Sequence, residues 1–377
     1  MMIEAGNSQL GGPVEVIWEP KRFKSKLFEI ISEAKSKLCL SFYIFENDKF
    51  GSEVIEALKA KARQGVLVEL LIDGFGSLNF IESLKKIEGC SVRVYHPLPW
   101  PFSGHWFQWF KFGPKLLWFL WNVNIRNHQK MLIADDSAAV IGSRNIHSET
   151  LEWHETSLVL SDQSDIKQLQ LIFDWTWSRS HSKFFKNLKG RLTPGAKLDC
   201  KRLFSNHTRE LRKLKALMID SLLKDAKRRI TIVTPYFLPS KNDLKAMISA
   251  KIRGVSVEVL LPSLSDVPFT KKIAQYYYSR LLSNQIKVYE LNDKVLHAKY
   301  MIVDDYILVG SSNFNNRSRI RDLEIDYLCS EPQTEKTFNQ GFLRDLNQST
   351  EIKVQPKLKL LDLFLVKFSL FFFRSWF

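Results

Sequence analysis

Cysteine is scarce in this chain of 377 residues, and none of it occurs in a C-x-x-C pair. The scattered cysteines are predicted to be reduced, mostly buried side chains of a cytosolic protein; they are Cys39, Cys90, Cys200 and Cys329. The sequence also lacks a group of residues with the spacing of zinc or calcium ligands. We therefore expect neither a metal nor another cofactor.

Two kinds of apolar segment are missing as well. Residues 1–16 contain no basic stretch followed by an apolar run, so no signal peptide is predicted. The apolar C-terminal tail is interrupted by charges in every window long enough to span a bilayer, which argues against a transmembrane helix. We therefore predict a cytoplasmic protein that associates with the membrane peripherally.

Acidic residues are in short supply relative to basic ones. The chain has 40 Asp and Glu residues against 55 Lys and Arg residues, a formal net charge of +15. Such an excess predicts an anionic partner. Nucleic acid and an anionic phospholipid membrane both meet that description, and charge alone does not choose between them.

What the sequence does contain is a duplicated polar motif. NHQKMLIADDSAAVIGSRN begins at Asn127, and LHAKYMIVDDYILVGSSN begins at Leu296. Both copies share a His, a Lys, an Asp and a Gly-Ser-x-Asn: His128, Lys130, Asp135, Gly142, Ser143 and Asn145 in the first, and His297, Lys299, Asp304, Gly310, Ser311 and Asn313 in the second. One such triplet is common by chance, but two with matching flanks indicate a function.

The spacing of the motif indicates how its side chains are used. MLIAD and YMIVD are rich in β-branched and long aliphatic residues, which is typical of buried strands. Residues two apart on a strand project to the same side, so the His and Lys of each copy should face one space. The Asp then marks a hairpin turn, and the returning strand brings Gly-Ser-x-Asn back beside them. Imidazole, ammonium and amide groups together suit a phosphodiester anion.

Two H-x-K-x4-D…G-S-x-N motifs in one chain resemble the phospholipase D superfamily, and the lead-in RNHQK at residues 126–130 is similar to that of bacterial cardiolipin synthases. The resemblance implies two tandem α/β/α sandwich domains, with mixed and mostly parallel sheets, related by a pseudo-twofold axis. Both motifs would share one cleft, so a monomer should suffice for catalysis. There are two departures. The second motif is one residue shorter between Asp and Gly, and the chain lacks the N-terminal transmembrane helices found in some cardiolipin synthases.

The internal repeat extends beyond the motifs. Residues 57–73 and 246–262 each show a helix-then-strand pattern, and each Gly-Ser-x-Asn is followed by a strand and then a helix rich in aromatic residues or Leu. Strands that alternate with amphipathic helices predict an α/β fold. We predict a first domain over residues 1–190, a second domain over residues 191–355, and an amphipathic tail over residues 356–377.

Displacing an alcohol from a phosphodiester needs a nucleophile, a proton donor and neutralisation of the anion. Near neutral pH one His can attack phosphorus while the other protonates the leaving alcohol, and the resemblance favours His128 as nucleophile and His297 as acid and base. The Lys and Asn of each motif would hold the non-bridging oxygens, with its Gly and Ser contributing to substrate binding. The resemblance also implies an orienting carboxylate for each imidazole, at Glu155 and Glu324. The Asp of each motif completes the predicted catalytic set, although its position is that of a turn residue.

Two apolar segments favour lipid as the substrate. An insertion at residues 97–123, absent from the second half, carries five tryptophans, namely Trp100, Trp106, Trp109, Trp118 and Trp121. Trp and Phe mixed with a few Lys suit the headgroup region of a membrane, and a base-stacking platform or a lid packed on the core are the alternatives. The tail places most of its polar residues within one helical arc, which favours an in-plane membrane anchor over a core helix.

These observations predict a phosphatidyltransferase of the cardiolipin synthase type, which transfers a phosphatidyl group through phosphohistidine to a lipid such as phosphatidylglycerol. The same residues would serve a phospholipase D-type lipid hydrolase if water were the acceptor. A metal-independent phosphodiester nuclease is the alternative from another substrate class, but it would need neither the aromatic insertion nor the apolar tail, so nucleic acid is the less favoured partner. A non-enzymatic membrane-binding protein is the last alternative, and the presence of both His, Lys and Asn sets argues against it.

Overall fold

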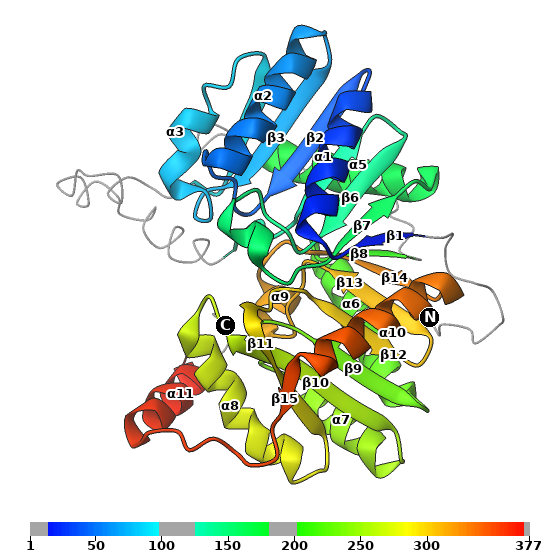
Figure 1. Cartoon of the computed structure of the whole chain (residues 1–377), viewed down its shortest axis with the longest axis vertical. Coiled ribbons are helices and arrows are strands. Elements are labelled where there is room, and N and C mark those ends of the chain that lie inside the picture. Colours follow the sequence, from blue (N-terminus) through cyan, green and yellow to red (C-terminus); the bar gives the residue numbers. More distant parts are fainter. Residues whose placement is uncertain (1–13, 98–124, 181–201, 373–377) are drawn as a thin grey trace.

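The computed structural model describes residues 14–97, 125–180 and 202–372. The five tryptophans of the predicted aromatic insertion lie outside these ranges, as does the predicted domain boundary at residue 190. Figure 1 shows two halves, each built around one sheet, stacked along the long axis of the molecule. The predicted α/β class and the division into two tandem units are confirmed.

The first half contains a sheet of seven strands with helices packed against it. Its strands are β1 (Glu15–Ile17), β2 (Lys37–Phe42), β3 (Leu67–Asp73), β4 (Cys90–Tyr95), β5 (Met131–Ala134), β6 (Ala138–Gly142) and β7 (Ser157–Leu160). Its α-helices in the described residues are α1 (Pro20–Glu33), α2 (Lys49–Arg63), α3 (Ile81–Leu84) and α5 (Gln163–Arg179).

The second half repeats this arrangement and adds to it. Its strands are β8 (Leu203–Ser205), β9 (Arg229–Val233), β10 (Ser256–Leu264), β11 (Lys287–Val295), β12 (Tyr300–Val303), β13 (Tyr306–Gly310), β14 (Ile325–Cys329) and β15 (Ser349–Glu351). Its α-helices are α6 (Arg209–Asp225), α7 (Lys241–Ile252), α8 (Pro268–Leu282), α9 (Asn316–Ile320), α10 (Pro332–Asn347) and α11 (Leu360–Phe372).

The strand orders confirm the internal repeat. The first sheet runs β1-β7-β6-β5-β2-β3-β4, and the second runs β8-β14-β13-β12-β9-β10-β11 with β15 added at its end. The expectation of mostly parallel sheets is wrong. Among the described strands only β2, β3 and β4, and likewise β9, β10 and β11, pair in parallel, and the remaining pairings are antiparallel. Parallel pairing needs a crossover helix, whereas the motif strands return directly through hairpins and are therefore antiparallel.

Both faces of the motif strands are buried, which explains their continuous apolar runs. On β5, Met131 and Ile133 join a central core shared by the two halves, while Leu132 faces the outer core under α1 and α2. On β12, Tyr300 and Ile302 enter the same central core. Helices α5 and α10 also contribute to it, so the central core holds the two halves together.

The two motif hairpins have the same register despite their different lengths. Met131 pairs with Ile141 across β5 and β6, and Tyr300 pairs with Val309 across β12 and β13. The second hairpin closes through a turn one residue shorter. The predicted shortening of this hairpin is confirmed, and it leaves the face of each strand unchanged because the residue is lost from the turn and not from the ladder.

The apolar tail forms helix α11, which packs against α8 beside the second sheet (Figure 1). In α11, Val366 is fully buried, and the Asp362 carboxylate lies 2.6 Å from the Lys272 ammonium of α8. The opposite face of the helix stays exposed. Within the described ranges, no helix is both long and apolar enough to cross a membrane. Cys39 and Cys329 are buried free thiols, as expected, and Cys90 is a partly buried one.

Candidate active site

The two histidines lie just before β5 and β12, where each half pairs its backbone with the other. The His128 N–H donates to the Leu323 carbonyl at 2.9 Å, and the Leu323 N–H donates to the Arg126 carbonyl at 2.8 Å. The pairing is repeated in the other direction, since the His297 N–H donates to the His154 carbonyl at 2.8 Å. Each motif is therefore held against the residue that precedes the other half's predicted orienting glutamate.

This exchange brings each imidazole to a carboxylate of the other half. His128 Nδ1 lies 3.0 Å from Glu324 Oε2, and His297 Nδ1 lies 2.8 Å from Glu155 Oε1. Both carboxylates are fully buried. A carboxylate on Nδ1 fixes the tautomer and the orientation of the ring and leaves Nε2 for chemistry. Neither half on its own contains a complete His and Glu pair.

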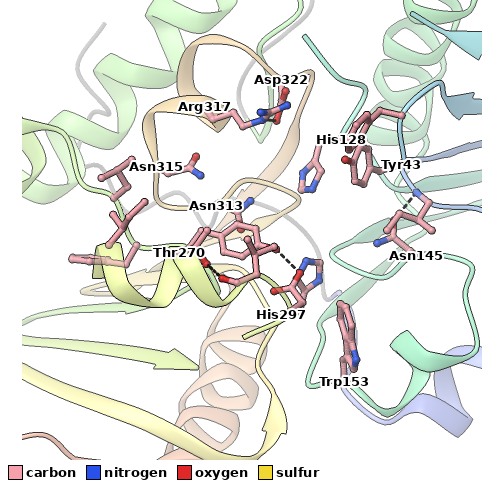
Figure 2. A pocket seen from close by; sticks show the side chains of 18 residues that line it. Tyr43, His128, Asn145, Trp153, Thr270, His297, Asn313, Asn315, Arg317 and Asp322 are labelled. Carbon is pink, nitrogen blue, oxygen red and sulfur yellow. Dashed lines mark hydrogen bonds and ion pairs between the residues drawn. The ribbon is translucent and has the colours of Figure 1, made fainter. Parts of the chain in front are cut away.

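Both histidines face one cavity of about 310 Å³ between the halves (Figure 2). Asn145 and Asn313, the last residues of the two motifs, line the same cavity. The Asn145 side-chain oxygen accepts a hydrogen bond from the Ile44 N–H at 3.1 Å, which fixes that amide. The structure thus brings the His and Asn of the two motifs together at one place, as the resemblance implied.

The two lysines lie behind the histidines, in the protein interior. Lys130 Nζ donates to the His128 carbonyl at 2.8 Å, and Lys299 Nζ donates to the His297 carbonyl at 2.6 Å. Burial lowers the pKa of Lys130 to about 7, assisted by the nearby Lys299, and lowers that of Lys299 to about 8. Neither lysine lines the cavity, so the structure does not show the predicted contact with the non-bridging oxygens, but positive charge behind the histidines still suits an anionic ligand.

The pKa values of both histidines are lowered as well. Burial is the main cause for His128, whose pKa falls well below its ordinary value, and Lys130 and Lys299 add to the effect. Burial also lowers the pKa of His297, but there the Glu155 carboxylate opposes the shift. The imidazole of His128 is therefore held in its neutral, nucleophilic form more firmly than that of His297.

The pKa values of the two carboxylates that contact these histidines also differ. Burial raises the pKa of both, but for Glu155 the interaction with His297, together with the charges of Lys299 and Arg144, outweighs burial and brings the pKa down to about 2. For Glu324 burial prevails and raises the pKa to about 7, although Lys130 opposes it. Two sites that are alike in geometry are thus unlike in charge.

The predicted aspartates are far from this chemistry. Asp135 lies in the β5–β6 turn, at the opposite end of β5 from His128, with φ of 51°. Its carboxylate accepts hydrogen bonds from the backbone N–H groups of residues 35, 36 and 37, at 2.7–2.9 Å. Asp304 has the same role, with backbone donors at residues 227, 228 and 229. These residues fasten the hairpins to β2 and β9, and the structure gives no support to their inclusion in the catalytic set.

The Gly and Ser of each motif also differ from their predicted role, because neither pair lines the cavity. A Cβ at Gly142 would lie 2.3 Å from the Thr156 carbonyl, and one at Gly310 would lie 2.2 Å from the Ile325 carbonyl. Glycine is required there for close approach of a neighbouring strand and not of a ligand. Ser311 Oγ donates to Glu324, so it positions a carboxylate instead of binding substrate.

Several cavity residues escaped the sequence prediction. They are aromatic or charged side chains from outside the motifs, on loops or, for Arg317, on helix α9: Tyr43, Phe75, Trp153, Tyr236, Asp266, Arg317 and Asp322. Tyr43 follows β2 and Tyr236 follows β9, which are corresponding strands of the two halves, so the internal repeat contained a signal for these two residues. Among the described residues, the side chains of Glu46, Asp48 and His147 have possible metal-ligand atoms within 4.8 Å of one another, but none of the three lines the cavity.

Comparisons with known proteins agree with this geometry. Cardiolipin synthase 1 of Bacillus anthracis is 28% identical over 351 residues, which cover 87% of this chain but 65% of that protein. A cardiolipin synthase of Halalkalibacterium halodurans is 26% identical over 358 residues, covering 90% and 67% of the two chains. This chain thus spans only about two thirds of the length of these relatives.

The fold itself has a solved counterpart in the crystal structure of phosphatidylserine synthase from Haemophilus influenzae Rd KW20. The TM-score is 0.69 at 16% identity, with 96% of this chain and 94% of that chain covered, so the likeness is one of fold. A family model described as cardiolipin synthase, PLD-like domain, matches residues 27–177 and 219–346. Because these residues are most of the chain and include both motifs and both orienting glutamates, the chain belongs to the cardiolipin synthase-type family of PLD-like domains.

Proposed function

We propose that this protein is a phosphatidyltransferase of the cardiolipin synthase type, which works through a covalent phosphohistidine. The observation that carries the proposal is the cavity with two imidazoles, each held at Nδ1 by a buried carboxylate from the other half. Two such imidazoles with Nε2 available are what a two-step displacement at phosphorus needs.

In the first step, the neutral imidazole of one His attacks the phosphorus of a phospholipid. A P–N bond forms, the P–O bond to the headgroup alcohol breaks, and the second His, protonated, gives its proton to the leaving oxygen. In the second step the acceptor alcohol gives its proton to that second His and attacks phosphorus, and the P–N bond breaks. The buried ammonium groups of Lys130 and Lys299 and the amides of Asn145 and Asn313 offset the negative charge throughout.

The electrostatics support His128 as the nucleophile and His297 as the acid and base. Burial and the two lysines hold His128 neutral, whereas the ionised Glu155 and the nearby Asp266 favour the protonated form of His297. A brief reaction with labelled phospholipid, followed by denaturation in mildly alkaline detergent, in which the P–N bond of phosphohistidine survives, should trap label on the wild type and on His297→Ala. The His128→Ala variant should trap none. Label on His128→Ala and none on His297→Ala would reverse the two roles.

Lipid as the substrate is supported by the apolar residues around the cavity. Its lining includes Phe237, Leu238 and Ile273, and Phe75 and Val267 line it while staying 56% and 42% exposed. The exposed face of α11, packed on the same helix α8 that lines the cavity, adds large apolar side chains: Leu360, Leu361, Phe364, Leu365, Phe368 and Phe371. Exposed lysines precede that face along the chain. This combination fits peripheral binding to an anionic phospholipid membrane.

The purified protein, in the presence of EDTA, would be given vesicles of labelled phosphatidylglycerol or a DNA oligonucleotide. The proposal expects cardiolipin and glycerol. Phosphatidic acid alone would identify a lipid hydrolase that uses the same cavity with water as acceptor. Cleaved DNA without lipid turnover would identify a nuclease, and no turnover with or without EDTA would refute the phosphodiester chemistry itself.

A further inference from the structure

The cavity contains a cationic residue that the duplicated motifs do not account for. Arg317, on the short helix α9, lines the cavity close to His128, as Figure 2 shows. Its charge contributes to the lowered pKa of His128, which places it within electrostatic reach of the reacting groups. Each half contributes one motif lysine, Lys130 or Lys299, but Arg317 has no counterpart in the first half.

The asymmetry follows from the sequence after each Gly-Ser-x-Asn. In the second motif, Asn315 and Arg317 follow Asn313 at alternate positions, and both line the cavity. The corresponding residues of the first half are His147 and Glu149, and neither lines the cavity. One wall of the cavity therefore has an amide and a guanidinium that the pseudo-twofold axis does not repeat.

The structure holds this guanidinium in a fixed position. Arg317 Nε donates to Asp322 Oδ2 at 2.7 Å, and Asp322 Oδ1 accepts from the Arg126 N–H at 3.1 Å. Asp322 is buried, and both of its oxygens are engaged, so it acts as an anchor for Arg317. The Asn315 side-chain oxygen accepts from the Ser318 N–H at 2.9 Å, which fixes the amide beside it. A planar guanidinium fixed by a carboxylate is well suited to bind a phosphate.

The proposed reaction uses the duplicated groups for one phosphate. The phosphoryl group that reacts is bound between two histidines, with one Asn from each half beside it and the two lysines behind the histidines. An acceptor such as phosphatidylglycerol has a phosphate of its own, separated from the attacking hydroxyl by the length of one glycerol. That second phosphate needs a cationic group near the reacting phosphorus. Because there is one acceptor phosphate, a single group that is not repeated in both halves is sufficient.

Resting on the proposed function, we propose that Arg317, with Asn315 beside it, forms a second anion subsite that binds the phosphate of the acceptor lipid. The subsite selects phosphate-bearing alcohols over neutral alcohols and water. It makes the chain a transferase to phospholipid acceptors and not a general phospholipase. Arg317 contributes to the choice of acceptor, while the cleavage of the donor depends on the duplicated residues.

Competition between two acceptors tests this subsite. Vesicles of labelled phosphatidylglycerol are mixed with ethanol, a neutral acceptor, so that one phosphatidyl-enzyme partitions between cardiolipin and phosphatidylethanol. The ratio of these products does not depend on how much of a variant is folded. We expect Arg317→Gln to lower the ratio of cardiolipin to phosphatidylethanol at least about tenfold. Arg317→Lys, which keeps the charge but loses the paired N–H donors of the guanidinium, should lower it less.

Arg319→Gln is the matched control, because Arg319 lies on the same helix, does not line the cavity and pairs instead with Asp243 and Asp220. It should leave the ratio unchanged. An unchanged ratio in Arg317→Gln would overturn the subsite, and so would an equal loss of both products, which would assign Arg317 to the reacting phosphate. If the wild type formed neither product, the proposed function itself would fail, a result separate from either of these.

Discussion

At the scale of single residues, the two histidine and glutamate pairs have similar geometry but glutamates with different pKa values. Glu155 and Glu324 hold similar places, just before the strand that follows Gly-Ser-x-Asn, and each is hydrogen-bonded to Nδ1 of the other half's His. The pKa of Glu155 is nevertheless about 2, and that of Glu324 is about 7. The difference follows from what surrounds each carboxylate, and it predicts different responses to pH.

Replacing each glutamate by glutamine should reduce kcat at least about 100-fold, because the imidazole loses the carboxylate that orients it. The effects on stability should have opposite pH dependence. The folded-state pKa of Glu324 lies above its ordinary 4.5, so its stabilising contribution is present below pH 4.5 and is lost as the pH rises through about 7. The Glu324→Gln variant should therefore gain stability relative to the wild type between pH 5 and pH 8.

The folded-state pKa of Glu155 lies below 4.5, so its contribution is present above that pH and is lost as the pH falls through about 2. Glu155→Gln should accordingly be less stable than the wild type throughout pH 5–8, with little change across that window. Urea unfolding of the three proteins at several pH values measures both trends. Parallel stability curves for the two variants would contradict the assignment of charge.

At the scale of elements, the motif hairpins depend on their aspartates for attachment and not for chemistry. Asp135 accepts three backbone N–H groups and the Ser36 hydroxyl from the segment that leads into β2. Asp135→Ala should lower the free energy of unfolding by about 1–3 kcal/mol, while kcat per folded molecule stays the same. Asp136→Ala, an exposed change in the same turn, is the control for the unfolding measurement. A large loss of kcat in fully folded Asp135→Ala would return Asp135 to the catalytic set.

Helix α11 is the element that we expect to bind membrane. Phe364 and Phe368 stack on each other on its outer face and are 63% and 44% exposed. The double change of both residues to Glu should weaken sedimentation with anionic vesicles at least about tenfold, since each buried aromatic side chain is worth roughly 1.5–3 kcal/mol. Leu343→Glu, at an exposed position on α10, should leave binding intact. Equal binding by both variants would show that α11 is not the membrane anchor.

At the scale of the whole molecule, the exchange of glutamates makes one site out of two halves. Each His depends on a carboxylate from the other half, and the backbone pairing at Leu323 and His154 joins the halves at that point. The catalytic unit that we propose is therefore a single chain. Quenched reactions should trap no more than one phosphatidyl group per chain.

Mixing His128→Ala with His297→Ala should restore no activity, because both histidines of a cavity come from one chain, and each variant chain lacks one of them. Recovery of activity on mixing would instead indicate a site shared between chains. Size-exclusion chromatography of the active protein, run with the same preparations, should show a monomer.

Much of the fold and the site could be predicted from the sequence because the relevant signals are local. The continuous apolar runs MLIA and YMIV are typical of strands buried on both faces, and the Asp residues that follow mark the turns. The His, Lys and Asn of each motif lie within eighteen residues of one another, and duplication distinguished them from chance. The shorter second hairpin could also be predicted, since a slip in register would have turned the strand over.

Only the tertiary structure decided which residues of the two halves meet. His128 and Glu324 are 196 residues apart, and His297 and Glu155 are 142 residues apart. No local pattern specifies such pairs, because they depend on how the two sheets pack through their shared core. The difference in charge between the pairs likewise arises from burial and from neighbours distant in sequence. Arg317 is set by the local sequence after the second motif, but only the structure shows that it lines the cavity. The sequence alone determined the chemical groups and their spacing within each half, and the packing of the halves decided how those groups form one site.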